Sequence, residues 1–230
     1  MSKPVALILG SGPRVGAAVA AKFASTGYSV AITSRKAAEG KSPDGYLSIK
    51  ADLSNPSSVP AVFEAVKAEF KSAPSVIIYN AAALTPPTGD DLFSIPVESL
   101  NADLNTNTVS VYAAAKEAVK GWASLPGDSQ KVFIYTGNKL NTWIAPMVLT
   151  ATLGVGKRAT SYLIGSADTR YAKEGYRFFY ADERNADGSI KGMAIDGEAH
   201  ADFFAQLASG EGEVPWNATF VKGQGYVKFE

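Results

Sequence analysis

Cysteine is absent from this sequence of 230 residues, and histidine occurs once, as His200. Without cysteine the chain forms no disulfide, performs no thiolate chemistry and offers no Cys-ligated zinc site. A single histidine argues against a His-rich metal site and against a Ser-His-Asp triad, so we expect no metal cofactor. The lack of cysteine also suits a reducing compartment, and we expect a cytoplasmic protein.

The chain also lacks an excess of either charge and any long apolar run. Lys+Arg and Asp+Glu both total 22, so no overall positive field attracts nucleic acid. No apolar run approaches membrane-spanning length, and the first strand begins almost at once, so we expect neither a membrane partner nor a signal peptide. Apolar residues make up 46% and charged residues 19%, which is typical of a globular protein with a large core.

Short apolar runs alternate with segments of helical periodicity along the chain. We expect strands at residues 5–9, 28–33, 46–51, 75–79, 131–135, 176–180 and 225–229, and helices at 15–25, 57–71, 101–124, 156–173 and 198–209. This alternation predicts a Rossmann-type α/β fold, a doubly wound parallel sheet in three layers. With no repeat or linker in sight, we expect residues 1–230 to form a single domain, with about 184–230 supplying a substrate-side lid and the last strand.

The strongest chemical signal is a glycine-rich turn between the first strand and the first helix. Residues 9–16 read Leu-Gly-Ser-Gly-Pro-Arg-Val-Gly. Glycine permits a tight turn and lets a pyrophosphate approach the backbone, and the free N–H groups of the helix start favour anions. An ordinary strand-to-helix turn is the alternative. We predict that the turn binds a dinucleotide through Gly10, Ser11, Gly12, Pro13, Arg14, Val15 and Gly16.

The residues after the second strand refine the expected cofactor. NAD enzymes usually place a carboxylate here for the ribose hydroxyls, whereas this chain has Ser34 and Arg35. A hydroxyl and a cation suit a 2′-phosphate, and Arg14 could reach the same phosphate. The alternative is that both arginines are solvated surface residues. We therefore predict NADP(H) rather than NAD.

These features resemble the short-chain dehydrogenase/reductase family over nearly the whole chain. Gly10 and Gly16 match the first and last glycines of the family pattern TGxxxGxG, although Arg14 stands at the middle one. The family's adenine-contacting Asp is matched by the Asp of an Ala-Asp-Leu stretch, and its NNAG stretch is matched loosely by residues 79–82. The resemblance thus implies cofactor contacts by Asp52, Leu53, Asn80, Ala81 and Ala82.

The resemblance implies an active site that is only partly present. The family's helix asparagine is matched by Asn107, with Asn105 as the competing choice, and its lysine, which holds the nicotinamide ribose, is matched by Lys157. The family's proton-donating tyrosine lies four residues before that lysine, where this chain has Leu153. No serine follows the fifth strand, and the nearest hydroxyl belongs to Thr136.

Several polar residues at predicted strand ends could replace the missing donor, because open α/β sheets bind ligands at this edge. Asn138 could polarise a carbonyl, and the other candidates are Tyr135, Lys139, Asp182 and Glu183. For each of them an ordinary loop role is the alternative. The stretches 153–157 (LGVGK) and 180–184 (YADER) are similar to those of a group of fungal proteins of this family.

Three functions follow from this pattern. The first is an NADP(H)-dependent oxidoreductase with an atypical active site, which reduces a carbonyl, an activated C=C or a C=N bond of a small organic substrate. The second is a non-redox enzyme derived from the same family, such as a lyase, isomerase or cyclase. The third is a catalytically inactive sensor that binds NADP. The resemblance also implies a homodimer or homotetramer, formed through the helices near 101–124 and 156–173.

Overall fold

The computed structural model describes residues 3–229, whose nine strands form one sheet in the order β3-β4-β2-β1-β5-β6-β7-β8-β9. From β4 to β8 every strand pairs in parallel with its neighbour, whereas β3 and β9 are antiparallel edges. The strands are β1 (Val5–Leu9), β2 (Ser29–Ser34), β3 (Gly40–Lys41), β4 (Leu47–Lys50), β5 (Val76–Tyr79), β6 (Lys131–Thr136), β7 (Tyr176–Arg184), β8 (Asn217–Val221) and β9 (Gly225–Tyr226).

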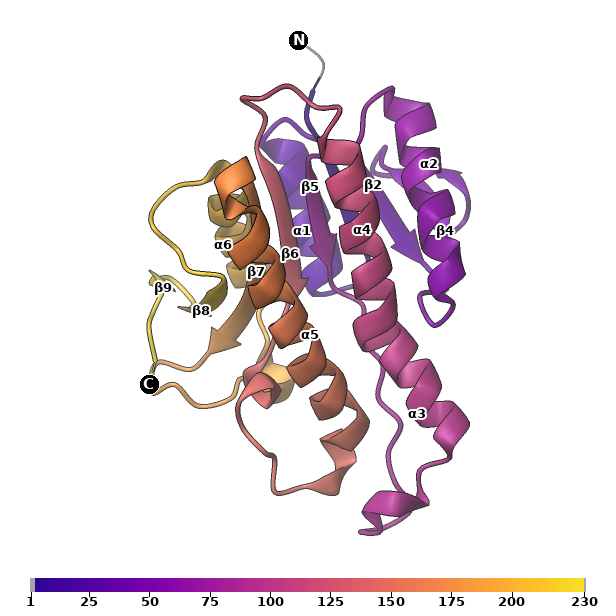
Figure 1. The fold of residues 1–230 in the computed structure, drawn as a ribbon, viewed down its shortest axis with the longest axis vertical. Helices are drawn as coiled ribbons and strands as arrows, with labels where there is room; N and C mark the ends of the chain where they lie inside the picture. The colour runs from indigo at the N-terminus through magenta and orange to yellow at the C-terminus, as the bar shows by residue number, and fades with distance from the viewer. Residues whose placement is uncertain (1–2, 230) are drawn as a thin grey trace.

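Helices cover both faces of this sheet, as Figure 1 shows. One layer contains α2, α4 and α5, and the opposite layer contains α1 and α6, which pack against each other. The helices are α1 (Val15–Ser25), α2 (Val59–Phe70), α3 (Val97–Leu104), α4 (Ser110–Trp122), α5 (Ala151–Tyr171) and α6 (Gly197–Ser209). The predicted three-layer Rossmann-type fold is confirmed.

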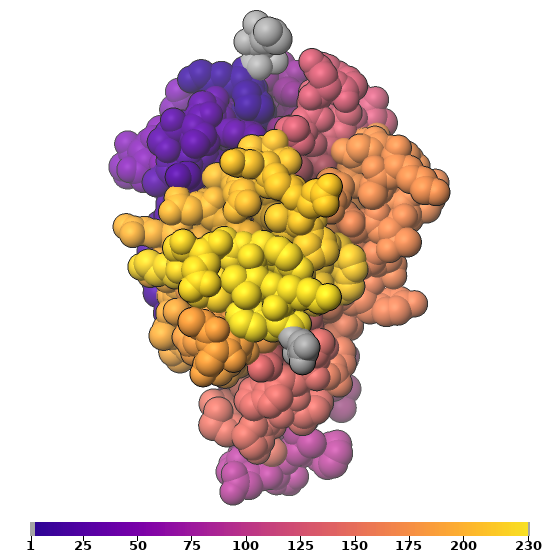
Figure 2. All heavy atoms as spheres, turned by 90° about the vertical axis from the view of Figure 1, so that its left-hand side faces the viewer, coloured from indigo at the N-terminus to yellow at the C-terminus, as the bar shows by residue number. Residues whose placement is uncertain are grey.

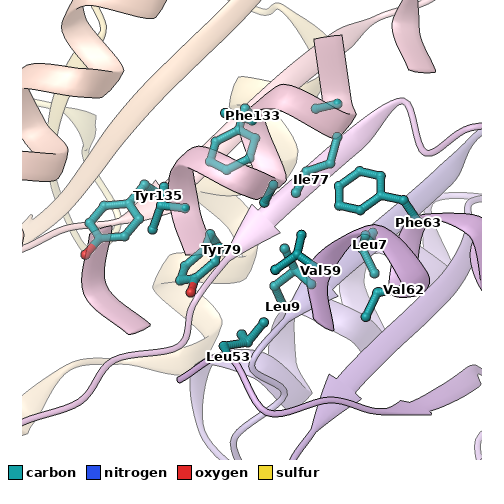
Figure 3. Packing of buried hydrophobic residues seen from close by; sticks show 14 of the residues in the cluster. Leu7, Leu9, Leu53, Val59, Val62, Phe63, Ile77, Tyr79, Phe133 and Tyr135 are labelled. Atoms are coloured by element: carbon teal, nitrogen blue, oxygen red, sulfur yellow. The ribbon is translucent and has the colours of Figure 1, made fainter. Parts of the chain in front are cut away.

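The central strands are apolar along their whole length because both of their faces are covered. All five residues of β1 and all four of β5 are buried. Leu7, Leu9 and Tyr79 pack toward α2 and α4 (Figure 3), whereas Ile8 and Ile78 pack toward α1 and α6. Since burying one Leu or Ile side chain contributes roughly 1.5–3 kcal/mol, this double core fixes the strands whose ends build the site.

The helix expected at 101–124 begins earlier and contains a π-helical turn. It runs through α3, a π-turn at Asn105–Val109 and α4 without a break. Helix α5 also begins earlier than expected, at Ala151, because Gly154 and Gly156 do not interrupt it. A Cβ on Gly156 would lie 2.4 Å from the Cβ of Asn107, so glycine here permits the close packing of α5 on the π-turn.

The C-terminal part differs most from the expected elements. Strand β7 continues to Arg184, four residues beyond its predicted end, and β8 is a strand that the pattern did not predict. This part of the chain was expected to supply a substrate-side lid and the last strand. Within the described residues it contributes α6, β8 and the last strand, β9, and the lid stays a prediction. Figure 2 shows this segment, coloured from orange to yellow, on the side that faces the viewer.

Candidate dinucleotide-binding and active site

A groove of about 680 Å³ lies at the carboxyl ends of β1, β2, β4 and β5. Open α/β sheets bind their ligands at this edge because the loops that follow the strands diverge there. Many residues that the sequence singled out for a cofactor line this groove. They are Gly10, Ser11, Gly12, Ser34, Arg35, Asp52, Leu53, Asn80, Ala81 and Ala82.

The glycine turn is fixed to the strands on both sides of β1. The Ser11 N–H donates to the Thr33 carbonyl at 2.8 Å, and Asn80 Nδ2 donates to the Gly10 carbonyl at 2.9 Å. Gly10 has a φ of +94°, and a Cβ there would lie 2.6 Å from the Ala81 nitrogen. Gly12 differs, because no atom lies within 4 Å of where its Cβ would be. The turn is therefore rigid at Gly10 and leaves open space at Gly12.

Helix α1 starts at Val15 in a form that suits an anion. Among the described residues no side chain caps its N-terminus, and its first turn contains no acidic residue. In the first turn the N–H groups of Ala17 and Ala18 donate to the carbonyls of Gly12 at 2.9 Å and Arg14 at 3.2 Å, so the N–H groups of Val15 and Gly16 are the ones that suit a phosphate. A Cβ on Gly16 would lie 2.7 Å from the Ser11 Cα, so glycine lets the turn lie close against the helix.

Arg14 does not turn toward Arg35 in this structure. Its Nη1 donates to the Met193 carbonyl at 2.8 Å, which joins the glycine turn to the loop before α6. Four residues predicted from the turn do not line the groove, namely Pro13, Arg14, Val15 and Gly16. Pro13 and Arg14 are exposed, whereas Val15 and Gly16 are buried in the start of the helix.

The end of the groove near β2 and β4 carries one cation and one carboxylate. Arg35 is exposed there, next to the half-buried Ser34. Asp52 Oδ1 accepts hydrogen bonds from the N–H of Ser54 at 3.0 Å and from its hydroxyl at 2.8 Å. These two bonds, the N–H first, lower the pKa of Asp52, and Arg35 adds to the effect. Asp52 is thus ionised at neutral pH, while Arg35 supplies a cation for an anionic ligand.

Asn107 lies fully buried in the π-turn and holds the segment after β5. Its Oδ1 accepts the Ala83 N–H at 2.9 Å, and its Nδ2 donates to the Ala83 carbonyl at 2.8 Å. Its own carbonyl accepts the hydroxyl of Thr160 at 2.7 Å and that of Tyr135 at 3.3 Å. π-Turns are frequent at functional sites because they free main-chain groups from the helical pattern.

Lys157 projects from α5 to the end of β6 and is 4% exposed. Its Nζ donates to the Thr136 carbonyl at 2.6 Å and lies 4.4 Å from the centre of the Tyr135 ring. Burial lowers the pKa of Lys157 to about 7, although the nearby Asp182 opposes the shift. The Thr136 hydroxyl is buried without a hydrogen-bond partner among residues 3–229. The structure thus brings Asn107, Thr136 and Lys157 together around Tyr135, but Lys157 does not line the groove.

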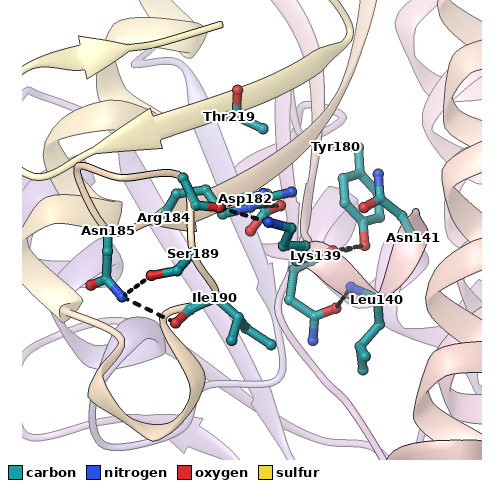
Figure 4. A network of polar contacts seen from close by, with 12 residues as sticks. Lys139, Leu140, Asn141, Tyr180, Asp182, Arg184, Asn185, Ser189, Ile190 and Thr219 are labelled. Atoms are coloured by element: carbon teal, nitrogen blue, oxygen red, sulfur yellow. Dashed lines mark hydrogen bonds and ion pairs between the residues drawn. The ribbon is translucent and has the colours of Figure 1, made fainter. Parts of the chain in front are cut away.

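A network of buried charges follows at the ends of β6 and β7 (Figure 4). Asp182 Oδ2 accepts from Arg184 Nε at 2.5 Å, and the Gly188 carbonyl accepts from Arg184 Nη1 at 3.1 Å and from Lys139 Nζ at 2.9 Å. Burial raises the pKa of Asp182 to about 6, and Arg184 counteracts this. The charges of this network are therefore compensated by one another and by main-chain groups.

Asn138 takes part in local structure beside this network. Its Oδ1 accepts the Leu140 N–H at 3.1 Å, and its carbonyl accepts the Tyr180 hydroxyl at 2.8 Å. On the opposite face of β7, Glu183 lies 3.4 Å from Lys191 and 3.5 Å from His200, and its carboxylate is buried. The contact between Glu183 and His200 was not predictable from the sequence, because it joins β7 to α6 across the fold.

Sequence reasoning missed several residues that line the groove. They are Thr33, Ala51, Ser54, Ala83, Leu84, Ala102, Asp103 and Thr106. Asp103 precedes Asn107 by four residues, and residues four apart lie on the same face of a helix. That spacing could have identified Asp103 as a groove residue from the sequence, because a helix was expected here and Asn107 was already a predicted site residue.

A parallel α/β sheet whose carboxyl edge carries a glycine turn and a long groove defines the Rossmann class of dinucleotide-binding proteins. A family model described as Enoyl-(Acyl carrier protein) reductase matches residues 13–136. The chain is 41% identical to the short chain dehydrogenase/reductase dmxR12 of Cryptosporiopsis sp. (strain 8999), an alignment that covers 100% of this chain and 96% of that protein. The chain belongs to the short-chain dehydrogenase/reductase family.

Solved structures agree with this chain in fold. A short-chain dehydrogenase/reductase from Serratia marcescens BCRC 10948 has a TM-score of 0.76 at 21% identity, with 96% of each chain covered. A 3-ketoacyl-(acyl-carrier-protein) reductase from Brucella melitensis complexed with NADH has a TM-score of 0.79 at 20% identity, with 96% of this chain and 97% of that chain covered. Within residues 3–229, none of the helices is long and apolar enough to span a membrane.

Proposed function

We propose that the chain uses NADP(H) to reduce a carbonyl, an activated C=C or a C=N bond of a small organic molecule, with an active site that departs from the family pattern. The observation that carries this proposal is the groove itself. It joins the open space at Gly12 to Arg35 and Asp52 within one continuous surface. An uncapped helix start and a cation at one end suit the two kinds of phosphate in NADP(H).

Arg35 is the main reason for preferring NADP(H). It stands at the end of β2, where a carboxylate would favour NAD, and Ser34 beside it offers a hydroxyl. The NADPH-dependent aldehyde reductase 2, chloroplastic, of Arabidopsis thaliana supports the choice, since it is 31% identical over 50% of this chain and 48% of its own length. The Brucella melitensis reductase, solved with NADH, shares the fold at lower identity.

The proposed active site lacks the proton donor of the family. Leu153 lies four residues before Lys157, and its side chain transfers no proton. When bound, NADPH would supply a hydride, and this chain's residues would hold the substrate and provide a proton. Thr136 is our candidate donor because its hydroxyl has no partner within the described chain, and Lys157 would hold the Thr136 carbonyl in place. Asn107 would fix the segment after β5, and Asn138 would polarise a substrate carbonyl.

A second candidate function is binding of NADP(H) without turnover, or non-redox catalysis on the same scaffold. The supporting observation is that these charged side chains bond within the protein. Lys157 donates to the Thr136 carbonyl, and Arg184 donates to Asp182. None of the three lines the groove. Steady NADPH oxidation with a panel of aldehydes, quinones and imines would select the oxidoreductase. Turnover without cofactor would select the non-redox enzyme, and tight binding without turnover would select the sensor.

We further propose that residues 1–230 form one domain that assembles as a homodimer or homotetramer in the cytoplasm. Exposed apolar side chains on the outer surfaces of the π-turn, α4 and α5 support the assembly. Val109, Tyr112, Val155 and Tyr162 are between 44% and 81% exposed. We expect a small-molecule substrate and no nucleic-acid or membrane partner.

The first test is calorimetric titration of the protein with NADPH, NADP and NADH. We expect micromolar binding of NADPH, weakened about tenfold to hundredfold in Arg35→Ala, because a charge-assisted bond to the 2′-phosphate is lost. Binding of NADH should hardly change in this variant. The matched control is Lys36→Ala, which removes a neighbouring exposed cation.

Two results would contradict the cofactor proposal. Absence of binding for all three nucleotides would exclude both the NADP(H)-dependent enzyme and the NADP sensor. Equal losses of NADPH affinity in Arg35→Ala and Lys36→Ala would show that Arg35 acts only through general charge.

A further inference from the structure

A second cavity, of about 540 Å³, lies between the segment that follows β5 and the loop that precedes α5. Both segments lie at the lower end of the molecule in Figure 1. The lining is apolar except for one carboxylate, and its residues are Pro87, Gly89, Asp90, Pro146, Met147, Val148 and Leu149. Met147 and Leu149 are 61% and 46% exposed, so the cavity presents apolar surface to solvent. A hollow of this kind favours an apolar ligand.

One short segment connects this cavity to the candidate active site. Leu84 lines the groove and Pro87 lines the cavity, and the chain between them spans at most about 11 Å. The Thr85 N–H donates to the Thr152 hydroxyl oxygen at 3.3 Å, so the segment lies against the first turn of α5. Lys157 follows on the same helix, about 7.5 Å further along its axis. This arrangement allows one molecule to occupy the cavity and reach the candidate active site.

The charges of the first wall are all negative. The sequence contains no lysine or arginine between Lys71 and Lys116. Asp90 and Asp91 lie in the segment that follows β5, Glu98 lies in the first turn of α3, and all three are exposed. An anionic group in the cavity would therefore be repelled from this side, because like charges repel and this wall holds no cation.

The cations of the second wall point away from the cavity. Lys139 Nζ donates to the Gly188 carbonyl at 2.9 Å. Arg158 donates through Nε to the Asn141 carbonyl at 3.0 Å and through Nη2 to the Thr142 carbonyl at 2.7 Å. Neither cation is among the residues that line the cavity. The lining thus offers an anion no positive partner, in contrast to the groove, which holds Arg35.

We propose that this cavity holds the apolar part of the substrate, and that the substrate is an apolar carbonyl, C=C or C=N compound without an anionic group. This inference rests on the proposed function and specifies its substrate class. A carboxylate or phosphate that entered the cavity would lose hydration and face Asp90 without a compensating cation. Acyl thioesters of coenzyme A or of a carrier protein carry phosphate groups, so the same charges disfavour them.

The test compares benzylacetone, an uncharged aromatic ketone, with the same ketone carrying a carboxylate on its ring. NMR titration of the protein with each compound, with and without saturating NADP, measures the two affinities. At low ionic strength we expect benzylacetone to bind about threefold to tenfold more tightly, as one exposed charge contact allows. Salt should narrow this difference, because it screens the exposed Asp90.

Three variants locate the effect. In Asp90→Asn the affinities for the two compounds should approach each other, because the carboxylate of the lining is removed. The matched control is Asp128→Asn, an exposed carboxylate before β6 at the opposite edge of the sheet, which should leave their ratio unchanged. Met147→Ser should weaken both compounds several-fold, because it removes an apolar part of the lining.

The outcomes separate this inference from the proposed function. If the carboxylate binds as tightly as benzylacetone, or if Asp90→Asn and Asp128→Asn change their ratio equally, the charge argument is wrong while the cofactor proposal stands. If benzylacetone does not bind, or binds equally to Met147→Ser, the cavity is not the apolar site. Absence of NADPH binding, read from the separate calorimetric titration, would instead overturn the proposed function and with it the role of the cavity as a substrate site.

Discussion

Replacement of two glycines of the same turn by alanine should change the stability of the protein in opposite directions. Gly10 has a φ of +94°, in the region that L-residues rarely adopt, and its Cβ would meet the backbone of Ala81. Gly12 has no positive φ and open space around it, yet it lines the groove. We expect Gly10→Ala to lower stability and Gly12→Ala to lower affinity for NADPH.

The magnitude for Gly10→Ala comes from two costs. A left-handed backbone costs an L-residue about 1–2 kcal/mol. The new Cβ would also lie 2.6 and 2.7 Å from the Ala81 nitrogen and Cα, and forcing an extra methyl into such packing costs about 1–3 kcal/mol. The sum is roughly 2–5 kcal/mol, a large part of a typical unfolding free energy of about 5–15 kcal/mol.

For Gly12→Ala the expected change in stability is small and favourable. An alanine that fits the native backbone stabilises a protein by about 0.4–1 kcal/mol, because it restricts the unfolded chain. The added methyl would nevertheless occupy space that a pyrophosphate needs for close approach to the turn. We therefore expect NADPH affinity to fall at least tenfold while the folded protein remains intact.

Urea denaturation monitored by circular dichroism measures the stability of both variants, and calorimetric titration measures their affinity for NADPH. If Gly10→Ala is as stable as Gly12→Ala, the close approach between Gly10 and Ala81 does not constrain the turn. If Gly12→Ala binds NADPH as tightly as the wild-type protein, the open space at Gly12 is not where the cofactor lies.

Two further predictions concern α5. Gly156→Ala should lower the free energy of unfolding by about 1–3 kcal/mol, because its Cβ would lie 2.4 Å from the Cβ of Asn107. Gly154→Ala should raise the free energy of unfolding by about 0.5–1 kcal/mol, because its Cβ would point into open space. Equal shifts of the two variants in urea titrations would contradict this packing. Lys157 has a pKa of about 7 in the folded protein and 10.5 in the unfolded chain, so the unfolded chain binds more protons between these pH values. The stability of the wild-type protein, relative to Lys157→Met, should therefore rise from pH 7 to 9 by up to about 1.4 kcal/mol per pH unit. Parallel stability curves for the two proteins would refute the pKa shift.

The sequence was informative where a single segment determines the structure. The run at Val5–Leu9 is apolar throughout because helices cover both faces of β1, and the glycines that follow it mark the turn. The place of Arg35 after the second strand predicted its role from the residues alone, whereas Asp52 and Asn80 were implied by the family resemblance; all three line the groove. Their convergence follows from the parallel sheet rather than from any one motif.

The sequence was uninformative where partners lie far apart in the chain. The charged residues Asp182 to Arg184 resemble the start of a loop, yet they continue β7 because they pair in parallel with Thr219–Val221 of β8. The direction of Lys157 likewise depends on the Thr136 carbonyl, which only the folded sheet places beside α5. Local preference for a loop is overridden in such cases by tertiary contacts.

Unmatched buried polar groups occur in both halves of the site. The groove holds the open turn at Gly12 and the unpaired Oδ2 of Asp103, and the uncapped start of α1 follows that turn. At the ends of β6 and β7 the buried cations have protein partners, but Thr136 Oγ1, Asn141 Oδ1 and Glu183 Oε1 are buried without a hydrogen-bond partner among the described residues. Because an unpaired buried polar group lowers stability, its retention in a fold favours a ligand-binding role there. This reasoning supports the proposed cofactor role of the groove, and it makes the Thr136 hydroxyl one of several candidate contacts for a substrate oxygen or nitrogen.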